Sequence, residues 1–349
     1  MTLPRVTVII PHWNGEDFLR RCLVSLSKTT YPALEILVID NHSTDNSVAM
    51  VQREFSDVRL VQSDKNLGYV GGCNLGIQSS DSPFFVLLNN DTEVTPEWLD
   101  VPMQMILEDP NVAGVQPKLR SLLNKDYFDY CGGAGGELDI FGYPLTWGRV
   151  FNHIEKDMGQ YDDPRSIFWA TGAACLLRRS AIEQVGTLDV SFFAHMEEID
   201  LFWRLHLAGF KVVYCPDSVV YHYNGGTLGQ EKLQKMVLNH RNSQIMLLKN
   251  YQFQTLIWLY PLRLTLECIT AMGSVVRGDL KRFAAVFIAF GGVLKRIPLW
   301  SKERRKVQAL RKRSDKQIMK KMIQQSVALG YYFQNKNKIT DFLSNYIET

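Results

Sequence analysis

Three carboxylates lie within four positions of one another in an apolar segment, where a charged side chain is costly. Glu197, Glu198 and Asp200 occur in the sequence SFFAHMEEIDLFWRL, which begins at Ser191. A carboxylate among apolar neighbours loses its contacts with water, so another group must compensate for that loss. Two explanations are open. The carboxylates either stabilise a helix N-terminus, where they meet unpaired backbone N–H groups, or include a general base beside a cation or phosphate site.

A second polar cluster, in the sequence LLNNDTEV, follows an apolar run and contains Asn89, Asn90 and Asp91. A carboxylate at the end of a strand can hold a hard divalent cation. Mg²⁺ commonly uses one or two carboxylates together with substrate phosphates and water. The alternative is that Asp91 caps the following helix, but Thr95 is better placed for that cap. The pattern favours metal binding by Asp91.

Strands that alternate with helices must position these groups. The patterns of apolar residues predict strands over 5–10, 34–40, 58–62 and 84–94, and helices over 15–29, from Ser47 onward and within 66–80. This alternation predicts an α/β fold with a mostly parallel sheet. In such sheets ligands bind at the carboxyl ends of the strands, and the polar clusters 40–45, 66–74 and 89–91 all fall at those ends.

After residue 120 the sequence patterns that predict strands and helices are weaker. Residues 120–165 are rich in Gly, Tyr and Asp, which indicates short strands or a hairpin over the cleft. A strand followed by a helix is expected within 169–186, a helix over about 197–208 closed by Gly209, and a strand from Lys211.

Asp40 and Asn41 directly follow the second predicted strand, where a short carboxylate or amide could hydrogen-bond a base edge or a ribose. The glycines after Asn66 do not fit the G-x-G-x-x-G pattern, so the sequence lacks a dinucleotide-binding fingerprint. They would still allow a ligand to approach the backbone closely.

Composition and charge exclude several classes of protein. Apolar residues make up 46% of the 349 residues and charged residues 21%, which predicts a folded chain with a substantial core. Residues 1–294 carry a net charge of −7, so we expect no nucleic-acid partner. None of the six cysteines forms a C-x-x-C pair, which favours a reducing compartment over a zinc module or a disulfide framework.

From His240 onward the chain predicts apolar helices that charged residues interrupt. Its two most apolar segments have uncharged runs of 13 residues (250–262) and 12 residues (283–294), and a spanning helix needs about 18–20. Residues 295–349 carry a net charge of +10. Apolar helices next to basic residues favour binding to an anionic membrane surface, although core helices and a solvated basic helix remain alternatives.

Five blocks, in this order, resemble the family 2 glycosyltransferases of GT-A fold, in particular a rhamnosyltransferase-like branch. The blocks are VTVIIPHWNGEDFLRRCLVSL, EILVIDNHSTDNSV, NLGYVGGCN, LLNNDTEV and FFAHMEEIDLFWRLHLAGFKVVYCPDSVVYH. The resemblance covers about residues 4–225. It implies a catalytic domain over 1–235, with a nucleotide-sugar-binding half (1–95) and an acceptor and catalytic half (96–235). A helical, basic, membrane-associating region is then expected over 236–349.

The resemblance also implies roles for single residues. Asp91 and His222 would bind a divalent metal, Mg²⁺ or Mn²⁺, and Glu198 would be the catalytic base, in an acidic group with Glu197 and Asp200. Asp200 is expected to orient Arg204, one helical turn further on. The residues expected to bind the nucleotide sugar are Pro11, Asp40, Asn41, Asn66, Gly68, Asn74, Asn89 and Asn90.

Two positions depart from the family pattern. Asn89 replaces the first aspartate of the usual Asp-x-Asp metal motif, and the usual Glu-Asp pair is Glu197–Glu198 here. The second change leaves open which of the two glutamates is the base, because the longer side chain of a glutamate displaces its carboxylate.

The implied reaction is inverting transfer of a sugar from a nucleoside diphosphate. The expected donor is dTDP-rhamnose, and the expected acceptor is a glycan or polyprenyl-linked glycan of cell-surface polysaccharide synthesis, at the cytoplasmic face of the membrane. Alternatives are a UDP-galactose or UDP-N-acetylglucosamine donor, and a nucleotide-sugar-binding protein with impaired catalysis. Sugar-phosphate nucleotidyl transfer is disfavoured, because PHWNG after the first strand has no Lys or Arg to hold a triphosphate.

Overall fold

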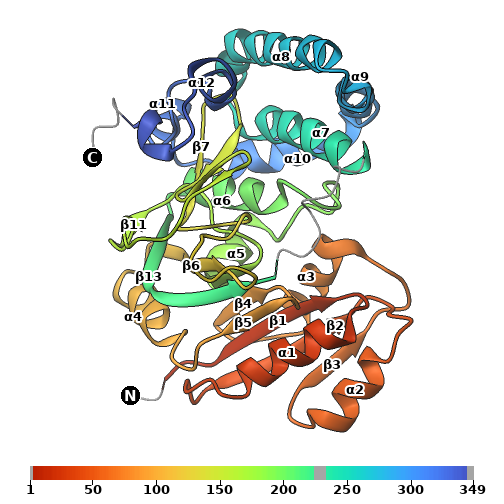
Figure 1. The fold of residues 1–349 in the computed structure, drawn as a ribbon, viewed down its shortest axis with the longest axis vertical. Coiled ribbons are helices and arrows are strands. Elements are labelled where there is room, and N and C mark those ends of the chain that lie inside the picture. The colour runs from red at the N-terminus through yellow and green to blue at the C-terminus, as the bar shows by residue number, and fades with distance from the viewer. Residues whose placement is uncertain (1–2, 224–232, 344–349) are drawn as a thin grey trace.

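The computed structural model describes residues 3–223 and 233–343 and centres on one large mixed sheet (Figure 1). Its strand order is β11-β13-β6-β12-β4-β1-β2-β3, with β5 paired to β13. The first part is parallel and consists of β1 (Val6–His12), β2 (Leu34–Asp40), β3 (Arg59–Gln62) and β4 (Phe84–Leu88). It alternates with α1 (Glu16–Leu26), α2 (Ser47–Glu54) and α3 (Gly68–Gln78). The predicted order of these elements is confirmed.

The remaining strands make the sheet mixed. They and their helices are β5 (Thr92–Val94), α4 (Asp100–Glu108), β6 (Val112–Ser121), β11 (Arg165–Ser166), β12 (Ala174–Arg178), α5 (Arg179–Val185), α6 (Glu197–Leu207) and β13 (Lys211–His222). Strand β12 is antiparallel to β4 and β6, whereas β13 runs parallel to β6. The single strand expected over 84–94 is wrong. The chain leaves the sheet after Leu88 and pairs again from Thr92, so residues 89–91 form the break.

A second, small sheet covers part of the segment where short strands were expected. It is an antiparallel sheet of β7 (Gly136–Leu138), β8 (Pro144–Thr146), β9 (Arg149–Val150) and β10 (His153–Ile154). The prediction of short strands within 120–165 is confirmed.

Two glycines of α3 contact the sheet closely rather than facing a ligand as expected. A Cβ atom on Gly72 would lie 2.6 Å from Asn41 Nδ2 and 3.1 Å from Pro11 Cβ. A Cβ atom on Gly76 would lie 2.2 Å from Ile9 Cγ2. These contacts are with the first two strands, so the two glycines let α3 pack closely on the sheet. The expectation that they admit a ligand to the backbone is corrected for these two positions.

The C-terminal helices are α7 (Leu233–Asn250), α8 (Phe253–Val276), α9 (Leu280–Lys295), α10 (Ile297–Leu310), α11 (Asp315–Met319) and α12 (Val327–Gln334), followed by a 3₁₀ turn (Ile339–Phe342). They share a hydrophobic core with the sheet. The Tyr251 ring, for example, packs edge-on against Trp203 of α6 with centroids 4.8 Å apart. The expected boundary after residue 235 falls in the first turn of α7.

Within residues 3–223 and 233–343, no single helix is long and apolar enough to cross a membrane. Helices α9 and α10 together meet the criterion of length and composition, but the pair is bent by 69°.

Candidate active site

Pairing between β5 and β13 brings together two residues that are 131 positions apart in the chain. His222 lies opposite Thr92 in the antiparallel ladder, and the backbone N–H of Tyr223 donates to the carbonyl of Asp91 at 2.8 Å. As a result, His222 Nε2 lies 3.1 Å from Asp91 Oδ1. The two residues that the sequence analysis assigned to a metal are therefore neighbours, and the Asp91 side chain is still partly open to solvent.

The other ring nitrogen of His222 is held by Asp129, a residue that the sequence analysis missed. Asp129 is fully buried, and its Oδ1 lies 3.0 Å from His222 Nδ1. Burial opposes the charged imidazole, but hydrogen bonds to Asp129 and Asp91 outweigh it and hold the pKa of His222 well above its ordinary value. Asp129 lies in a segment without a recognisable motif, so only the fold identifies it.

This cluster has the donors that a divalent cation needs. Asp129, Cys131 and His222 offer ligand atoms within 4.8 Å of one another, and Asp91 adds a carboxylate oxygen. Asp129 Oδ2 is buried and has no hydrogen-bond partner among the described residues. Two carboxylates beside one imidazole attract positive charge, and the group offers oxygen, nitrogen and sulfur atoms as ligands. The residues fit a metal.

Two asparagines and a histidine extend the cluster towards β1. Asn89 Nδ2 lies 3.3 Å from His222 Nε2, and Asn90 Nδ2 lies 2.8 Å from His12 Nδ1. Burial lowers the pKa of His12, which favours a neutral imidazole whose Nδ1 accepts from Asn90. Its Nε2 is then a buried donor without a partner in the described chain. His12 was not predicted, although its position after the apolar strand that ends at Pro11 was the available signal.

The carboxyl ends of β1 and β2 hold the residues expected to contact the nucleotide. Asp40 is buried, and both of its oxygens lie 3.3 Å from the backbone N–H of Ser43. Asn41 donates to the carbonyl of Gly68 at 3.2 Å, and its buried Oδ1 has no partner in the described residues. Asn41 therefore joins two of the three polar clusters that the sequence analysis placed at the strand ends.

The start of α3 is shaped by its own polar residues. Asn66 Oδ1 accepts from the N–H of Gly68, which has a φ of 69°, at 2.8 Å. Asn74 is engaged elsewhere, because its amide donates to and accepts from the backbone of Leu188 at 2.8 and 3.1 Å. Asn66 and Gly68 thus form the turn at the strand ends, while Asn74 anchors the segment that leads to α6.

Glu197 and Glu198 begin α6, whose N-terminus has no side-chain cap. Glu197 is buried, whereas Glu198 is half-buried, and each has an Oε2 atom without a hydrogen-bond partner in the described residues. Burial raises the pKa of Glu198 to about 7. Burial and the neighbouring Glu198 charge hold the pKa of Glu197 well above its ordinary value. Burial and the Glu198 charge also raise the pKa of Cys175, on the strand beside β4.

The backbone before α6 is strained and is held from outside. Phe193, His195 and Met196 all have φ values between 67° and 72°, a conformation that is costly for residues with side chains. Asn242 of α7 is fully buried, and its Nδ2 lies within 2.8–3.1 Å of three carbonyl oxygens of this segment, those of Phe192, Ala194 and His195. A residue of the C-terminal helices therefore fixes the segment that presents Glu197 and Glu198.

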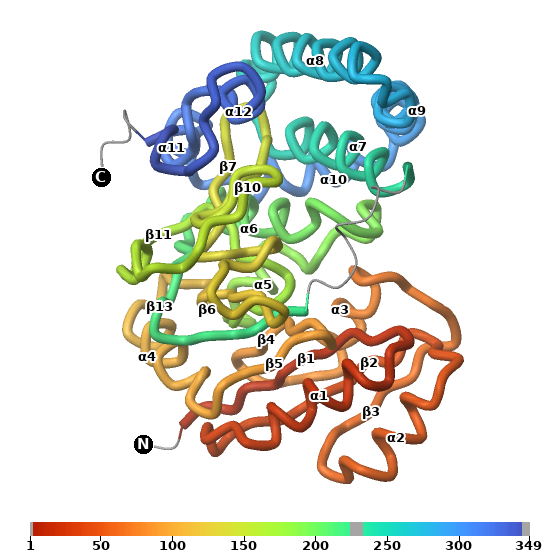
Figure 2. Tube along the Cα trace, in the orientation of Figure 1, coloured from red at the N-terminus to blue at the C-terminus, as the bar shows by residue number. Residues whose placement is uncertain are grey.

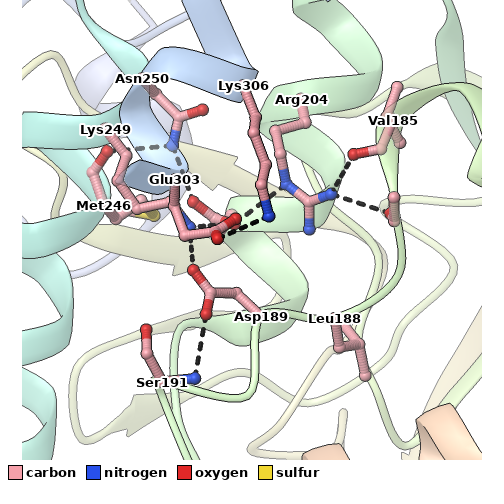
Figure 3. Close-up of polar contacts among 12 residues, drawn as sticks. Val185, Leu188, Asp189, Ser191, Arg204, Met246, Lys249, Asn250, Glu303 and Lys306 are labelled. Atoms are coloured by element: carbon pink, nitrogen blue, oxygen red, sulfur yellow. Dashed lines mark hydrogen bonds and ion pairs between the residues drawn. The ribbon is translucent and has the colours of Figure 1, made fainter. Parts of the chain in front are cut away.

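Asp200 belongs to a buried polar network, and Figure 3 labels its partners Arg204, Lys249 and Asn250. Its Oδ2 accepts from Arg204 Nε at 3.0 Å and from Lys249 Nζ at 3.1 Å, and its Oδ1 accepts from Asn250 Nδ2 at 2.8 Å. Lys249 also pairs with Asp189. The expected pairing with Arg204 is present, and these contacts give Asp200 a structural role in joining α6 to α7.

Known proteins resemble this chain over most of its length. An N-acetylglucosaminyl-diphospho-decaprenol L-rhamnosyltransferase of Mycobacterium tuberculosis is 28% identical over 295 residues, which cover 79% of this chain and 94% of the relative. The O-antigen biosynthesis protein RfbC of Myxococcus xanthus is 28% identical over 228 residues, which cover 64% of this chain and 18% of that protein.

Solved glycosyltransferases share the fold. A mannosyltransferase from Pyrobaculum calidifontis, in complex with GDP-Man and Mn²⁺, matches with a TM-score of 0.51 and 16% identity, over 88% of this chain and 86% of its own. GalNAc-T7, with UDP, GalNAc and Mn²⁺, matches with a TM-score of 0.53 and 18% identity. That match covers 68% of this chain and about half (48%) of the other. The expected GT-A fold is confirmed.

The family model for glycosyl transferase family 2 matches residues 7–186. This range includes the parallel strands, the break at Asn89–Asp91 and the strand β12 that lies beside them. The chain belongs to glycosyl transferase family 2 and is a glycosyltransferase.

Proposed function

We propose that this glycosyltransferase moves a sugar, with inversion, from a nucleoside diphosphate to a lipid-linked glycan. The contact between Asp91 and His222 at the strand ends supports the proposal, because a partly exposed carboxylate beside an imidazole could bind the cation of a donor diphosphate. Asp40 ends β2 and Asn41 follows it directly, on the far side of β1 from β4. Ligands bind at the carboxyl ends of the strands in open α/β sheets.

Glu198 is the proposed base. A general base works best when its pKa lies near the working pH, and burial brings Glu198 there. Glu197 is buried whereas Glu198 is half-buried, so an acceptor hydroxyl reaches the Glu198 side chain more easily.

In the proposed step, the Glu198 carboxylate accepts the proton of the acceptor hydroxyl. The acceptor oxygen attacks the anomeric carbon of the donor and forms the new glycosidic bond. The bond between that carbon and the diphosphate oxygen breaks, and the nucleoside diphosphate leaves with the electron pair. Asp91 and His222, supported by Asp129, would hold a divalent cation, which would neutralise the charge of the leaving diphosphate.

The proposed substrates rest on the relatives. The mycobacterial relative is named for rhamnose transfer to a diphospho-decaprenol-linked N-acetylglucosamine, so we propose dTDP-rhamnose as donor and a polyprenyl-linked glycan as acceptor. The proposed place of reaction is the cytoplasmic face of the cell membrane. The solved neighbours hold UDP or GDP-Man, so UDP-galactose, UDP-N-acetylglucosamine and GDP-mannose belong in the test.

The test measures the melting temperature with each nucleotide sugar in the presence of Mn²⁺ or Mg²⁺. A cognate donor at about 100 times its Kd stabilises the fold by about 2.7 kcal/mol through linkage. The donor that stabilises most is then offered with a short polyprenyl-diphosphate-linked sugar, and transfer is followed by mass spectrometry. Stabilisation without transfer to any offered acceptor would favour a binding protein, and no stabilisation by dTDP-rhamnose would remove that donor.

A further inference from the structure

Helix α8 has its charged residues on the inside and its apolar residues on the outside. Its only charged residues, Arg263 and Glu267, are 1% and 2% exposed and form a buried ion pair with each other. His240 of α7 contacts the same glutamate, with Nδ1 2.7 Å from Oε2. A helix on the surface of a protein in water normally shows the opposite pattern. The pattern therefore indicates that the outer face of α8 contacts something other than water.

The outer face continues from α8 onto α9 and the start of α10. Figure 2 shows α8 and α9 at the end of the molecule opposite α1 and α2. Their exposed residues include Phe253, Ile257, Trp258, Leu262, Ile269, Met272, Val275, Val276, Leu280, Phe287, Ile288, Phe290, Leu294, Ile297 and Leu299. We call these fifteen residues the apolar face. Val276, for example, is 86% exposed. So many exposed apolar side chains on adjoining helices mark a site that contacts another apolar body.

Cations flank the apolar face. Arg277 and Lys281 are exposed where α8 turns into α9, and Lys295 is exposed at the end of α9. Lys302 and Arg305 are exposed on α10, which follows directly. This part of the chain differs in sign from the rest, because residues 295–349 carry +10 and residues 1–294 carry −7. An anionic surface would attract this end of the molecule and repel the other.

Not every basic residue of the tail is available for that purpose. Arg304 donates to the carbonyl of Tyr251 at 2.6 Å, Arg311 pairs with Asp315 at 2.8 Å, and Arg313 donates to the carbonyl of Gly209 at 2.8 Å. These three arginines hold the tail on the body of the protein. The membrane attraction expected of the whole segment 295–313 is thus restricted to its exposed cations.

We propose that the apolar face lies in the interfacial region of an anionic lipid bilayer, with α8 and α9 parallel to the membrane plane. An apolar helix face enters that region by about 5–10 Å, and the flanking cations lie at the level of the lipid phosphates. A second copy of this chain is a poorer occupant, because two such faces would bring their basic edges together. The proposal agrees with a lipid-linked acceptor but does not depend on it.

Cys268 provides a test on the unmodified protein. It is the only exposed cysteine of the six, all of which the structure describes, and it lies on the exposed side of α8. Vesicles of phosphatidylcholine with phosphatidylglycerol should slow its reaction with a polar maleimide by about tenfold or more, because the side chain enters the lipid interface. Vesicles of phosphatidylcholine alone should protect it less. Equal labelling rates with and without anionic vesicles would overturn the proposal.

Flotation with the same vesicles tests whether residues of the apolar face bind the lipid. Ile257→Glu together with Met272→Glu should reduce the bound fraction by about tenfold or more, since both charges would enter the lipid interface. Val24→Glu is the matched control, because Val24 is an exposed apolar residue of α1, at the other end of the molecule. It should float like the unmodified protein.

The sedimentation velocity of the unmodified protein separates the lipid proposal from its main rival. A dimer that Ile257→Glu dissociates would identify a second copy as the occupant and overturn the proposal. Donor binding in the absence of vesicles tests the proposed function separately, so failure of one proposal does not imply failure of the other.

Discussion

Glu198 and Asp200 are two residues apart on α6, but they face different surroundings. Glu198 is half-buried with one oxygen unpartnered among the described residues, and burial raises its pKa to about 7. Asp200 is fully buried and accepts hydrogen bonds from Arg204, Lys249 and Asn250. One face of the helix keeps a carboxylate available for proton transfer, and the other uses a carboxylate to attach the helix to α7.

The comparison shows how a single acidic run can serve two purposes. An uncompensated carboxylate is destabilising but reactive, whereas a fully paired one is inert and fixes its neighbours. The predictions below are intended to separate these two roles.

The largest expected effect is that of Glu198→Gln on turnover. Glutamine keeps the size of the side chain but cannot accept the proton, so kcat should fall by about 10²–10⁴-fold. Donor binding, measured as the shift in melting temperature, should persist. Glu197→Gln is the matched control and should keep most of the activity. The opposite ranking of the two variants would make Glu197 the base.

Lys249→Met tests the structural role of Asp200, because it disrupts the buried network around that carboxylate. The substitution leaves the buried Asp189 without its cation and Asp200 with Arg204 as its only cation, which should lower the free energy of unfolding by about 3–5 kcal/mol in urea. The control is Lys306→Met. It removes an exposed pair with Glu303, also visible in Figure 3, and should cost about 0–1 kcal/mol. Equal costs for the two variants would mean that the buried network contributes little.

A third carboxylate extends the comparison to the metal cluster. Asp129→Asn keeps the shape of the side chain but removes the charge that orients His222, so Mn²⁺ affinity should fall by about 10–100-fold. The affinity is obtained from a Mn²⁺ titration of donor binding. Asp126→Asn, an exposed site in the same segment, should leave the affinity unchanged. Unchanged affinity in Asp129→Asn would remove Asp129 from the site.

Asn242→Ala tests whether α7 positions the base. The variant loses the amide that holds three carbonyl groups before α6, so kcat should fall by about tenfold as Glu198 loses its fixed place. The KM for the donor should change little. Gln234→Ala, an exposed substitution on the same helix, is the control. A change in donor KM with kcat intact would contradict a positioning role.

The last prediction concerns the pH dependence of activity and stability. The active base is deprotonated, so kcat/KM should rise about tenfold per pH unit below a pKa near 7 and level off above it. Stability should change in the opposite direction. The folded state binds the Glu198 proton more tightly than the unfolded chain, whose glutamate pKa is about 4.3. The free energy of unfolding should therefore decrease as the pH rises from about 4.5 to 7. Glu198→Gln should flatten the activity profile and reduce the slope of the stability profile, to which the buried Glu137 and Asp139, with pKa values of about 8 and 7, still contribute.

Local patterns were enough to predict the elements that lie near one another in the chain. Alternating strands and helices over the first ninety residues, and the polar groups at their carboxyl ends, follow from apolar periodicity and from the rules of parallel sheets. The pairing of Asp200 with Arg204 was also predictable, because it spans one helical turn.

Long-range contacts could not be predicted from such patterns. Asp129 and His12 carry no motif, and they join the cluster only because distant strands pair. Likewise, the segment before α6 owes its conformation to Asn242, some fifty residues further on. The interruption of the sheet at Asn89–Asp91 was missed because the β-branched residues Thr92 and Val94 follow it and continue the strand pattern.

The bulge in β13 has a consequence for how the metal cluster can change. The register of β13 on β6 shifts between Cys215 and Val219, and His222 meets Asp91 only beyond that shift. Side chains on a strand alternate between its two faces, so a one-residue slip of the pairing from Val219 onward would turn His222 to the opposite face. The register beyond the bulge is thus as restrictive as side-chain identity, whereas residues 216–218, which have no partner on β6, can absorb a change in length without moving the nitrogen ligand.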